Sequence, residues 1–283
     1  MEPLSNLSCG LEIAGLGLRV HTDDPEVEQG LAQRYRSFPL RHTPRLILAI
    51  HCAGRERSEA PPEASFWEGQ LFFTAAGYTG YVDISRGWGE LSLSSAWPVA
   101  DADYFIRGAF ALLAFVEGGL LLHAAGVVRE DHAYLFLGHS GAGKSTVARL
   151  SPSARLLNDD LVLLWPADGG WWACATPFGN PSSPMTSPGR ALVRVLLGLV
   201  QDREVRLEKV RPGVAVAEVV GNAPIVSLVP GWTEVLLARC QQILQAAPYY
   251  RLHFLPDDSF WRILNDEPDM ADGTPGGGGS SGG

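Results

Sequence analysis

A glycine-rich motif at residues 138–145 constrains this 283-residue chain more than any other feature. It reads Gly-His-Ser-Gly-Ala-Gly-Lys-Ser and fits the pattern G-x-x-x-x-G-K-[ST] at every fixed position. The apolar run 134–137 before it predicts a buried strand, and residues 146–150 after it predict the start of a helix. A strand, a loop of this composition and a helix are the setting in which such a motif holds nucleotide phosphates.

The motif assigns physical roles to its residues. Glycines let the loop curl so that its N–H groups point at phosphates, and the following helix adds its positive end. Lys144 is expected to reach the β- and γ-phosphates, and the Ser145 hydroxyl to ligate Mg²⁺. The predicted phosphate-binding residues are Gly138, His139, Ser140, Gly141, Ala142, Gly143, Lys144, Ser145 and Thr146. A glycine-rich connecting turn is the alternative, and the strand, spacing, lysine and serine together favour phosphate binding.

Two adjacent carboxylates, Asp159 and Asp160, follow about fifteen residues later, between apolar segments that predict two strands. A carboxylate at a strand end beside a phosphate loop usually ligates the Mg²⁺ of the nucleotide. Adjacent like charges raise one another's pKa values, so one carboxylate of such a pair is a candidate for accepting a proton from an attacking hydroxyl. A solvated Asn-Asp-Asp turn is the alternative interpretation.

His123 lies in the apolar, strand-like run 120–128, one polar turn upstream of the strand that leads into the motif. A histidine on an apolar strand is more often a hydrogen-bonded core residue than a catalyst. Three small residues follow it, Ala124, Ala125 and Gly126. Because they leave room for another molecule to approach, they support a site at His123.

In this order the motifs resemble the catalytic core of the HPr kinase/phosphorylase family, in particular its HPr-kinase-related or lasso-peptide precursor kinases. The resemblance rests on Leu-His-Ala-Ala-Gly-Val-Val, a turn, Leu-Phe-Leu-Gly-x-Ser-Gly-Ala-Gly-Lys-Ser-Thr, and then Leu-Leu-x-Asp-Asp. It extends less specifically to the segments 175–179 and 250–261, and covers about residues 110–265.

The resemblance implies a mixed α/β fold with a P-loop nucleotide core, similar to phosphoenolpyruvate carboxykinases, and a β-rich N-terminal region. It implies a serine kinase that uses Mg²⁺ and transfers the γ-phosphate of ATP, or of another nucleoside triphosphate, to a serine hydroxyl of a peptide or protein. By position, Asp159 would be the proton acceptor and Asp160 a magnesium-side carboxylate beside Ser145. His123 would be an active-site residue near the transferred phosphate, and Lys144 would keep its role on the phosphates.

The sequence departs from the family downstream of the paired carboxylates. HPr kinases have a Glu-Ile-Arg-Gly segment that supplies a magnesium ligand, and no such segment occurs here. Related short kinases often have a glutamate after the Thr-Pro-Phe turn, where this chain has Gly179 and Asn180. A neutral amide binds Mg²⁺ less well than a carboxylate. A nucleotide-gated binding module without transferase activity, and a kinase of a small hydroxyl metabolite, therefore stay open as alternatives.

Basic residues are densest between positions 190 and 211. Arg203 and Arg206 are candidates for a clamp on the transferred phosphate, where positive charge stabilises a loose transition state. Because Glu204 and Glu208 are interspersed, a solvated face of mixed charge is the alternative.

Composition and charge indicate which binding partners and which cellular compartment to expect. The net charge of −9 argues against a general nucleic-acid surface. Four scattered cysteines without a C-x-x-C pair indicate thiols in a reducing cytoplasm. No segment approaches the roughly 18 consecutive apolar residues of a membrane helix, so no membrane association is expected. A homo-oligomer is compatible with these features.

The chain divides by composition into a β-rich N-terminal region (1–100), a P-loop kinase core (101–265) and a tail (266–283) that ends in a Gly/Ser linker. The patterns predict these elements: strands at 11–20 and 45–51, a meander of short strands over 66–93, and helices at 24–36, 101–117 and 233–247. Asp101 is expected to be the N-cap of the second helix. The Ser/Pro-rich run 181–188 predicts an irregular loop, either a cover for the substrate or a plain connector.

Overall fold

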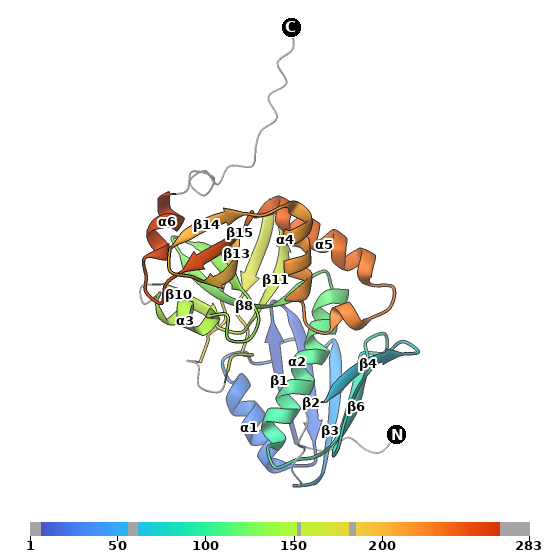
Figure 1. The fold of residues 1–283 in the computed structure, drawn as a ribbon. Helices are drawn as coiled ribbons and strands as arrows, with labels where there is room; N and C mark the ends of the chain where they lie inside the picture. Colours follow the sequence, from blue (N-terminus) through green and yellow to red (C-terminus); the bar gives the residue numbers. More distant parts are fainter. Residues whose placement is uncertain (1–6, 56–61, 152–153, 181–184, 267–283) are drawn as a thin grey trace.

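The protein has a mixed α/β fold with two β-sheets, one above the other in Figure 1. The structure is a computed structural model that describes residues 7–55, 62–151, 154–180 and 185–266. The first sheet is built from the N-terminal third of the chain, and the second from the rest. No helix of the described residues is long and apolar enough to cross a membrane.

The N-terminal sheet has seven strands in the order β1-β2-β3-β7-β6-β5-β4. Its strands are β1 (Leu7–Ile13), β2 (Leu16–Thr22), β3 (Leu46–Gly54), β4 (Glu63–Trp67), β5 (Gln70–Ala75), β6 (Tyr78–Asp83) and β7 (Trp88–Ser94). The predicted meander over 66–93 is confirmed. The single strand expected at 11–20 is wrong, because the chain reverses at Ala14 and Gly15, both with positive φ, and forms the antiparallel β1–β2 hairpin.

Two helices accompany this sheet, α1 (Pro25–Tyr35) and α2 (Pro98–Val116). The first begins where expected, because the carboxylate of Asp24 accepts hydrogen bonds from two backbone N–H groups of the first turn. The prediction that Asp101 caps the second helix is wrong. The helix begins three residues earlier, at Pro98, since proline suits the first helical position, and Asp101 instead accepts a hydrogen bond from the Ser95 hydroxyl.

The second sheet has eight strands. They are β8 (Leu120–Arg129), β9 (His132–Leu137), β10 (Arg155–Asn158), β11 (Leu161–Ala167), β12 (Gly170–Cys174), β13 (Arg190–Gln201), β14 (Arg206–Lys209) and β15 (Tyr249–Phe254). β9 lies between β8, antiparallel to it, and β13, parallel to it. The segment that leaves β9 therefore emerges at the interior of the sheet, next to the ends of its neighbours.

Short helices follow or flank these strands: α3 (Lys144–Arg149), α4 (Pro212–Gly221), the 3-10 turn η1 (Val226–Leu228), α5 (Thr233–Ala246) and α6 (Phe260–Asp266). The predicted helix over 233–247 is confirmed as α5. Part of the predicted loop 181–188 lies outside the described residues, as does most of the tail; residues 185–189 contain neither helix nor strand.

Helix α2 joins the two sheets into one hydrophobic core. Its Phe105 packs edge-on against Phe73 of β5, with ring centroids 5.4 Å apart. One and a half turns further along, Phe110 meets Phe178, which follows β12, at 5.5 Å. All four rings are fully buried. The N-terminal sheet is thus packed, through α2, against the segment around Phe178.

Candidate functional site

The glycine-rich motif forms the predicted strand–loop–helix unit, from β9 through the loop to α3. Gly141 and Gly143 have φ values of 83° and 112°, a region that side chains disfavour. A Cβ on Gly143 would also lie 2.5 Å from Cζ of Phe254. The loop therefore needs glycine at residue 143 both for its backbone angle and for the space that Phe254 occupies.

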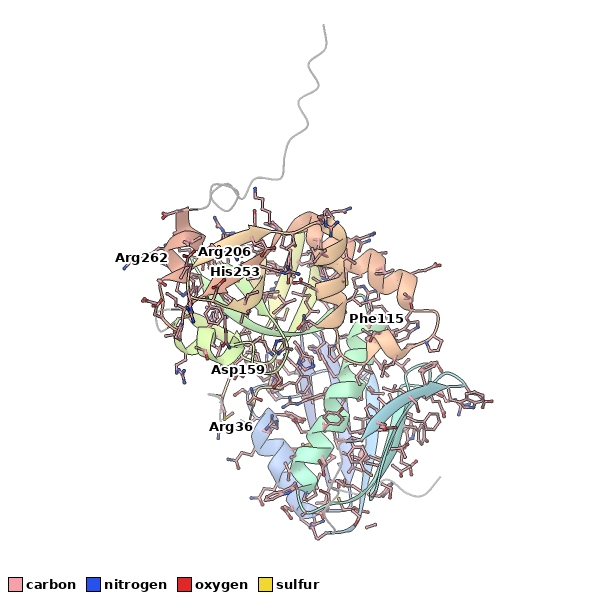
Figure 2. The ribbon with its side chains drawn as sticks, in the orientation of Figure 1. Arg36, Phe115, Asp159, Arg206, His253 and Arg262 are labelled. Atoms are coloured by element: carbon pink, nitrogen blue, oxygen red, sulfur yellow. The ribbon has the colours of Figure 1, made fainter. Side chains whose placement is uncertain are left out.

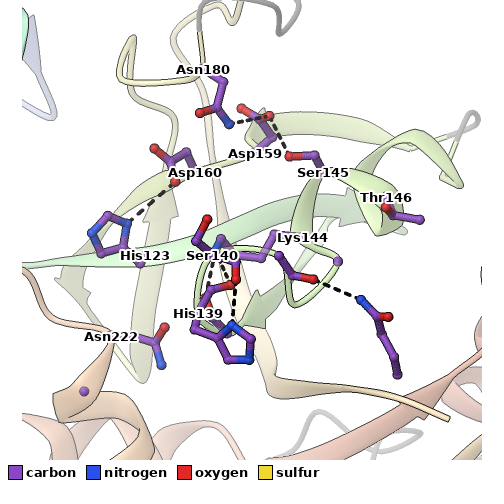
Figure 3. A pocket seen from close by; sticks show the side chains of 15 residues that line it. His123, His139, Ser140, Lys144, Ser145, Thr146, Asp159, Asp160, Asn180 and Asn222 are labelled. Atoms are coloured by element: carbon purple, nitrogen blue, oxygen red, sulfur yellow. Dashed lines mark hydrogen bonds and ion pairs between the residues drawn. The ribbon is translucent and has the colours of Figure 1, made fainter.

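A cavity of about 440 Å³ lies over this loop and is lined by residues from several segments (Figure 3). His123 comes from β8, and Asp159 and Asp160 come from the turn between β10 and β11. The loop contributes every predicted phosphate-binding residue except Ala142, which is buried behind it. The structure thus brings together the three motifs that are separate in the sequence.

Lys144 is held over the loop by backbone carbonyl groups. Its Nζ donates to the carbonyl oxygens of Gly138, at 2.7 Å, and His139, at 3.2 Å. Burial lowers the pKa of this ammonium group, and the two aspartates oppose that effect. A positive charge fixed on the wall of the cavity is suited to binding an anionic ligand.

Asp159 faces the first turn of α3. The Ser145 hydroxyl donates to its Oδ2 at 3.2 Å, and Asn180 Nδ2 donates to the same oxygen at 3.3 Å (Figure 3). A hydroxyl and a carboxylate side by side are the oxygen ligands that Mg²⁺ prefers. The sequence paired Ser145 with Asp160, whereas the structure pairs Ser145 with Asp159. In the described residues no group of three or more His, Cys, Asp or Glu side chains could hold a metal ion.

Asp160 has different partners. Its Oδ1 lies 3.6 Å from Nδ1 of His123, and its Oδ2 lies 3.3 Å from Nη1 of Arg107. Burial raises the pKa of this carboxyl, but His123, Arg107 and Lys144 together lower it further than burial raises it. The cationic neighbours of Asp160 therefore outweigh the effect of the adjacent negative charge.

The turn that carries both carboxylates is held by side-chain hydrogen bonds and is largely buried. The Asn158 side chain accepts hydrogen bonds from the N–H groups of Asp160 and Leu161 and donates to the carbonyl of Thr176. Asn158 is 1% exposed and Asp159 is 5% exposed. The alternative of a solvated Asn-Asp-Asp turn is therefore wrong. The turn fixes two carboxylates that point to different partners.

Several cavity or neighbouring residues were not predicted. Gln201 donates to the carbonyl of Gly141 at 2.9 Å, and the carbonyl of Asn222 accepts a hydrogen bond from the N–H of His123 at 2.8 Å. Arg107 was missed because it lies in α2, 53 residues before its partner Asp160. One signal could have indicated it: Arg107 is the sole basic residue of an otherwise apolar and acidic helix, and such a charge needs a buried partner.

The two arginines that were predicted to bind the transferred phosphate do not lie at the cavity. Neither Arg203 nor Arg206 lines it. Arg206 instead lies 3.1 Å from Nδ1 of His253 and also faces Asp202; in Figure 2 it lies beside His253, above Asp159. This cluster is a group of mixed charge on β14, β15 and the segment between β13 and β14.

No family model and no curated protein matches this chain. Among solved structures it is similar to the Hpr(Ser) kinase/phosphatase from Coxiella burnetii, with 16% sequence identity. The match covers 32% of this chain and 77% of that chain, with a TM-score of 0.25. So low a score supports no functional inference.

Proposed function

We propose that the protein is a nucleotide-dependent kinase that transfers a γ-phosphate to a hydroxyl group, and that this acceptor is a serine of a peptide or protein. One observation carries the proposal. A single cavity contains a glycine-rich phosphate loop with its lysine, a serine–carboxylate pair, and a second carboxylate paired with a histidine. Phosphoryl transfer needs these parts: a phosphate cradle, a metal site and a group that orients the nucleophile.

The loop and the serine–carboxylate pair serve the phosphate donor. Loop N–H groups and the Lys144 ammonium hold the triphosphate of ATP or a related nucleotide. Ser145 and Asp159 would hold Mg²⁺, with Asn180 beside them. When bound, Mg²⁺ neutralises charge that develops on the phosphate oxygens.

Asp160 and His123 act on the acceptor hydroxyl. Because the transition state of phosphoryl transfer is loose, a carboxylate of low pKa can orient the attacking hydroxyl and take its proton late in the reaction. The His123 side chain is 43% exposed and Asp160 is 21% exposed, so a hydroxyl on a large molecule can reach the pair from solvent. This assignment reverses the roles that were predicted for Asp159 and Asp160 from the resemblance to HPr kinases. A serine acceptor is what the resemblance of the three motifs to those of HPr kinases implies.

The test is transfer of labelled γ-phosphate from ATP or GTP to serine-containing peptides, with matched alanine peptides as the control. Transfer to the serine peptides that exceeds nucleotide hydrolysis in their absence, and that Asp160→Asn abolishes, is the expected result. Tight nucleotide binding without transfer to any peptide or small hydroxyl compound would contradict it. Nucleotide-dependent capture of a partner that Asp160→Asn leaves intact would then indicate a nucleotide-gated binding module.

A further inference from the structure

We infer that Arg107, assisted by Arg34, is a positioning residue for the carboxylate pair, and that the N-terminal layer of the molecule is therefore part of the catalytic apparatus. The inference rests on the proposed kinase function. Arg107 belongs to α2 and Arg34 to α1, the two helices that accompany the N-terminal sheet. Neither lines the cavity, so both would act through other residues.

Arg107 reaches three partners with three different nitrogen atoms. Nε donates to Oδ2 of Asp103 at 2.7 Å, Nη1 to Oδ2 of Asp160 at 3.3 Å, and Nη2 to the carbonyl of Gly179 at 2.9 Å. The side chain is 19% exposed. A guanidinium group is planar, with donors in a fixed fork, so these three contacts fix the partners relative to one another.

Arg34 shares two of these partners. Its Nη2 donates to the carbonyl of Gly179 at 2.7 Å, and its Nε lies 2.9 Å from Oδ1 of Asp103. Asp103 is 4% exposed and also accepts a hydrogen bond from the Tyr35 hydroxyl at 2.6 Å. Two guanidinium groups and two carboxylates, those of Asp103 and Asp160, thus form a balanced group of charges. Such pairing is what allows the carboxylate of Asp103 to be buried.

The segment that the arginines hold leads directly to the site. Gly179 precedes Asn180, whose side chain donates to Asp159. On the other side of Gly179, the fully buried Phe178 packs against Phe110 of α2 and Tyr35 of α1. The N-terminal helices therefore contact one carboxylate directly, through Arg107, and the other indirectly, through Gly179 and Asn180. If Arg107 only stabilised the fold, its hydrogen bonds to Asp103 and Gly179 would be sufficient. Its additional contact with Asp160 connects it to the site.

The experiment compares Arg107→Met and Arg34→Met with Arg239→Met as a matched control. Arg239 is also partly buried and donates to two carbonyl oxygens, those of Phe115 at 2.6 Å and Gly119 at 2.7 Å. These hydrogen bonds connect α5 to the C-terminal end of α2, and Arg239 does not line the cavity. The measurements are Tm, the affinity for Mg²⁺–ATP, and kcat and KM for phosphate transfer.

We expect Arg107→Met to lower kcat by at least about tenfold while the affinity for Mg²⁺–ATP changes by less than about threefold. Arg34→Met should lower kcat less, because Arg34 reaches only Gly179 and Asp103. Arg107→Lys should recover part of the lost kcat, since it restores one charged contact with Asp160. Arg239→Met should lower Tm and leave kcat within about twofold of the parent. If Arg107→Met behaves like Arg239→Met in all these measurements, the inference is wrong.

A second measurement separates this inference from the proposed function. Hydrogen–deuterium exchange of the segments 158–160 and 176–180 should be faster in Arg107→Met than in the parent, and unchanged in Arg239→Met. If the parent neither transfers phosphate nor hydrolyses nucleotide, the kinase proposal fails, and this exchange result alone decides whether Arg107 positions the two segments. Equal exchange in the parent and Arg107→Met would overturn the inference.

Discussion

Asp159 and Asp160 are neighbours in the chain, yet their side chains contact different groups. Asp159 accepts hydrogen bonds from the Ser145 hydroxyl and the Asn180 amide, which are neutral groups, and it also interacts electrostatically with Lys144. Asp160 faces His123 and Arg107, which are cationic or can become so. At the scale of single residues the site is thus divided into a half suited to a metal and a half suited to an acceptor hydroxyl.

This division predicts separable effects of two substitutions. Asp159→Asn should weaken Mg²⁺-dependent nucleotide binding by about tenfold or more, because it removes the charge beside Ser145. Asp160→Asn should lower kcat by about a hundredfold or more while leaving nucleotide affinity nearly intact, because an orienting group matters only when the hydroxyl attacks. Calorimetry with and without Mg²⁺, followed by transfer assays, measures both. Identical profiles for the two variants would show that neither role is right.

Lys144 gives the simplest test of the phosphate loop. Its ammonium group donates to the carbonyls of Gly138 and His139, and Lys144→Ala removes this charge while every glycine of the loop stays in the sequence. We expect the affinity for a nucleoside triphosphate to fall at least tenfold, or about 1.4 kcal/mol. Arg149→Ala, at the other end of α3, is the control. Equal affinities of Lys144→Ala and the parent would mean that the loop does not bind phosphate.

Most of the residues of the site could be predicted from the sequence, but their pairing could not. The loop, the two aspartates and His123 each have a local signature of composition and spacing. Which aspartate meets Ser145 depends on the Asn158 turn, whose hydrogen bond to Thr176 spans 18 residues. Arg107 and Asp160 are brought together only by the packing of α2. Contacts of this kind have no periodicity that a single sequence displays.

At the scale of elements, the loop between β9 and α3 has its shape because of what packs beneath it. Phe254, at the end of β15, fills the space under Gly143, and β15 runs parallel to β13, which runs parallel to β9. The ends of three parallel strands therefore support the loop. The sequence predicted the strand and helix around this loop correctly. It misplaced the start of α2, because Asp101 is a good capping residue that lies three residues inside a helix already begun by Pro98.

The support from Phe254 predicts different costs for two glycine substitutions. Gly143→Ala should lower the folding stability more than Gly141→Ala does. Both residues have positive φ, but of the two only Gly143 lacks room for a Cβ. We expect about 1 kcal/mol of lost stability for Gly141→Ala, from backbone strain, and about 2–4 kcal/mol for Gly143→Ala. Chemical denaturation measures both values. Equal losses would contradict the packing of Phe254 against the loop.

At the scale of the whole molecule, the two sheets share one core through α2. The helix places Phe105 on the N-terminal sheet and Phe110 on Phe178 of the second layer. Many buried side chains of both sheets belong to one continuous cluster, and a second cluster, around Phe136 and Trp261, belongs to the C-terminal layer alone. The compositional division of the chain near residue 100 therefore coincides with a change of sheet, while the packing continues across it.

A shared core predicts that the two sheets unfold together. Phe110→Ala should destabilise the protein by about 3–5 kcal/mol, because it leaves a cavity between α2 and Phe178. Both sheets should lose structure in the same transition, so near-UV and far-UV circular dichroism should give coincident midpoints in the parent and in the variant. Trp67→Ala is the control: Trp67 is also aromatic but 68% exposed on the edge strand β4, and its loss should change stability by no more than about 0.5 kcal/mol. Two separate transitions in the parent, or a Phe110→Ala variant in which only one sheet melts early, would show that α2 does not couple the layers, and the N-terminal helices could then not hold Asp160 and Gly179 in place.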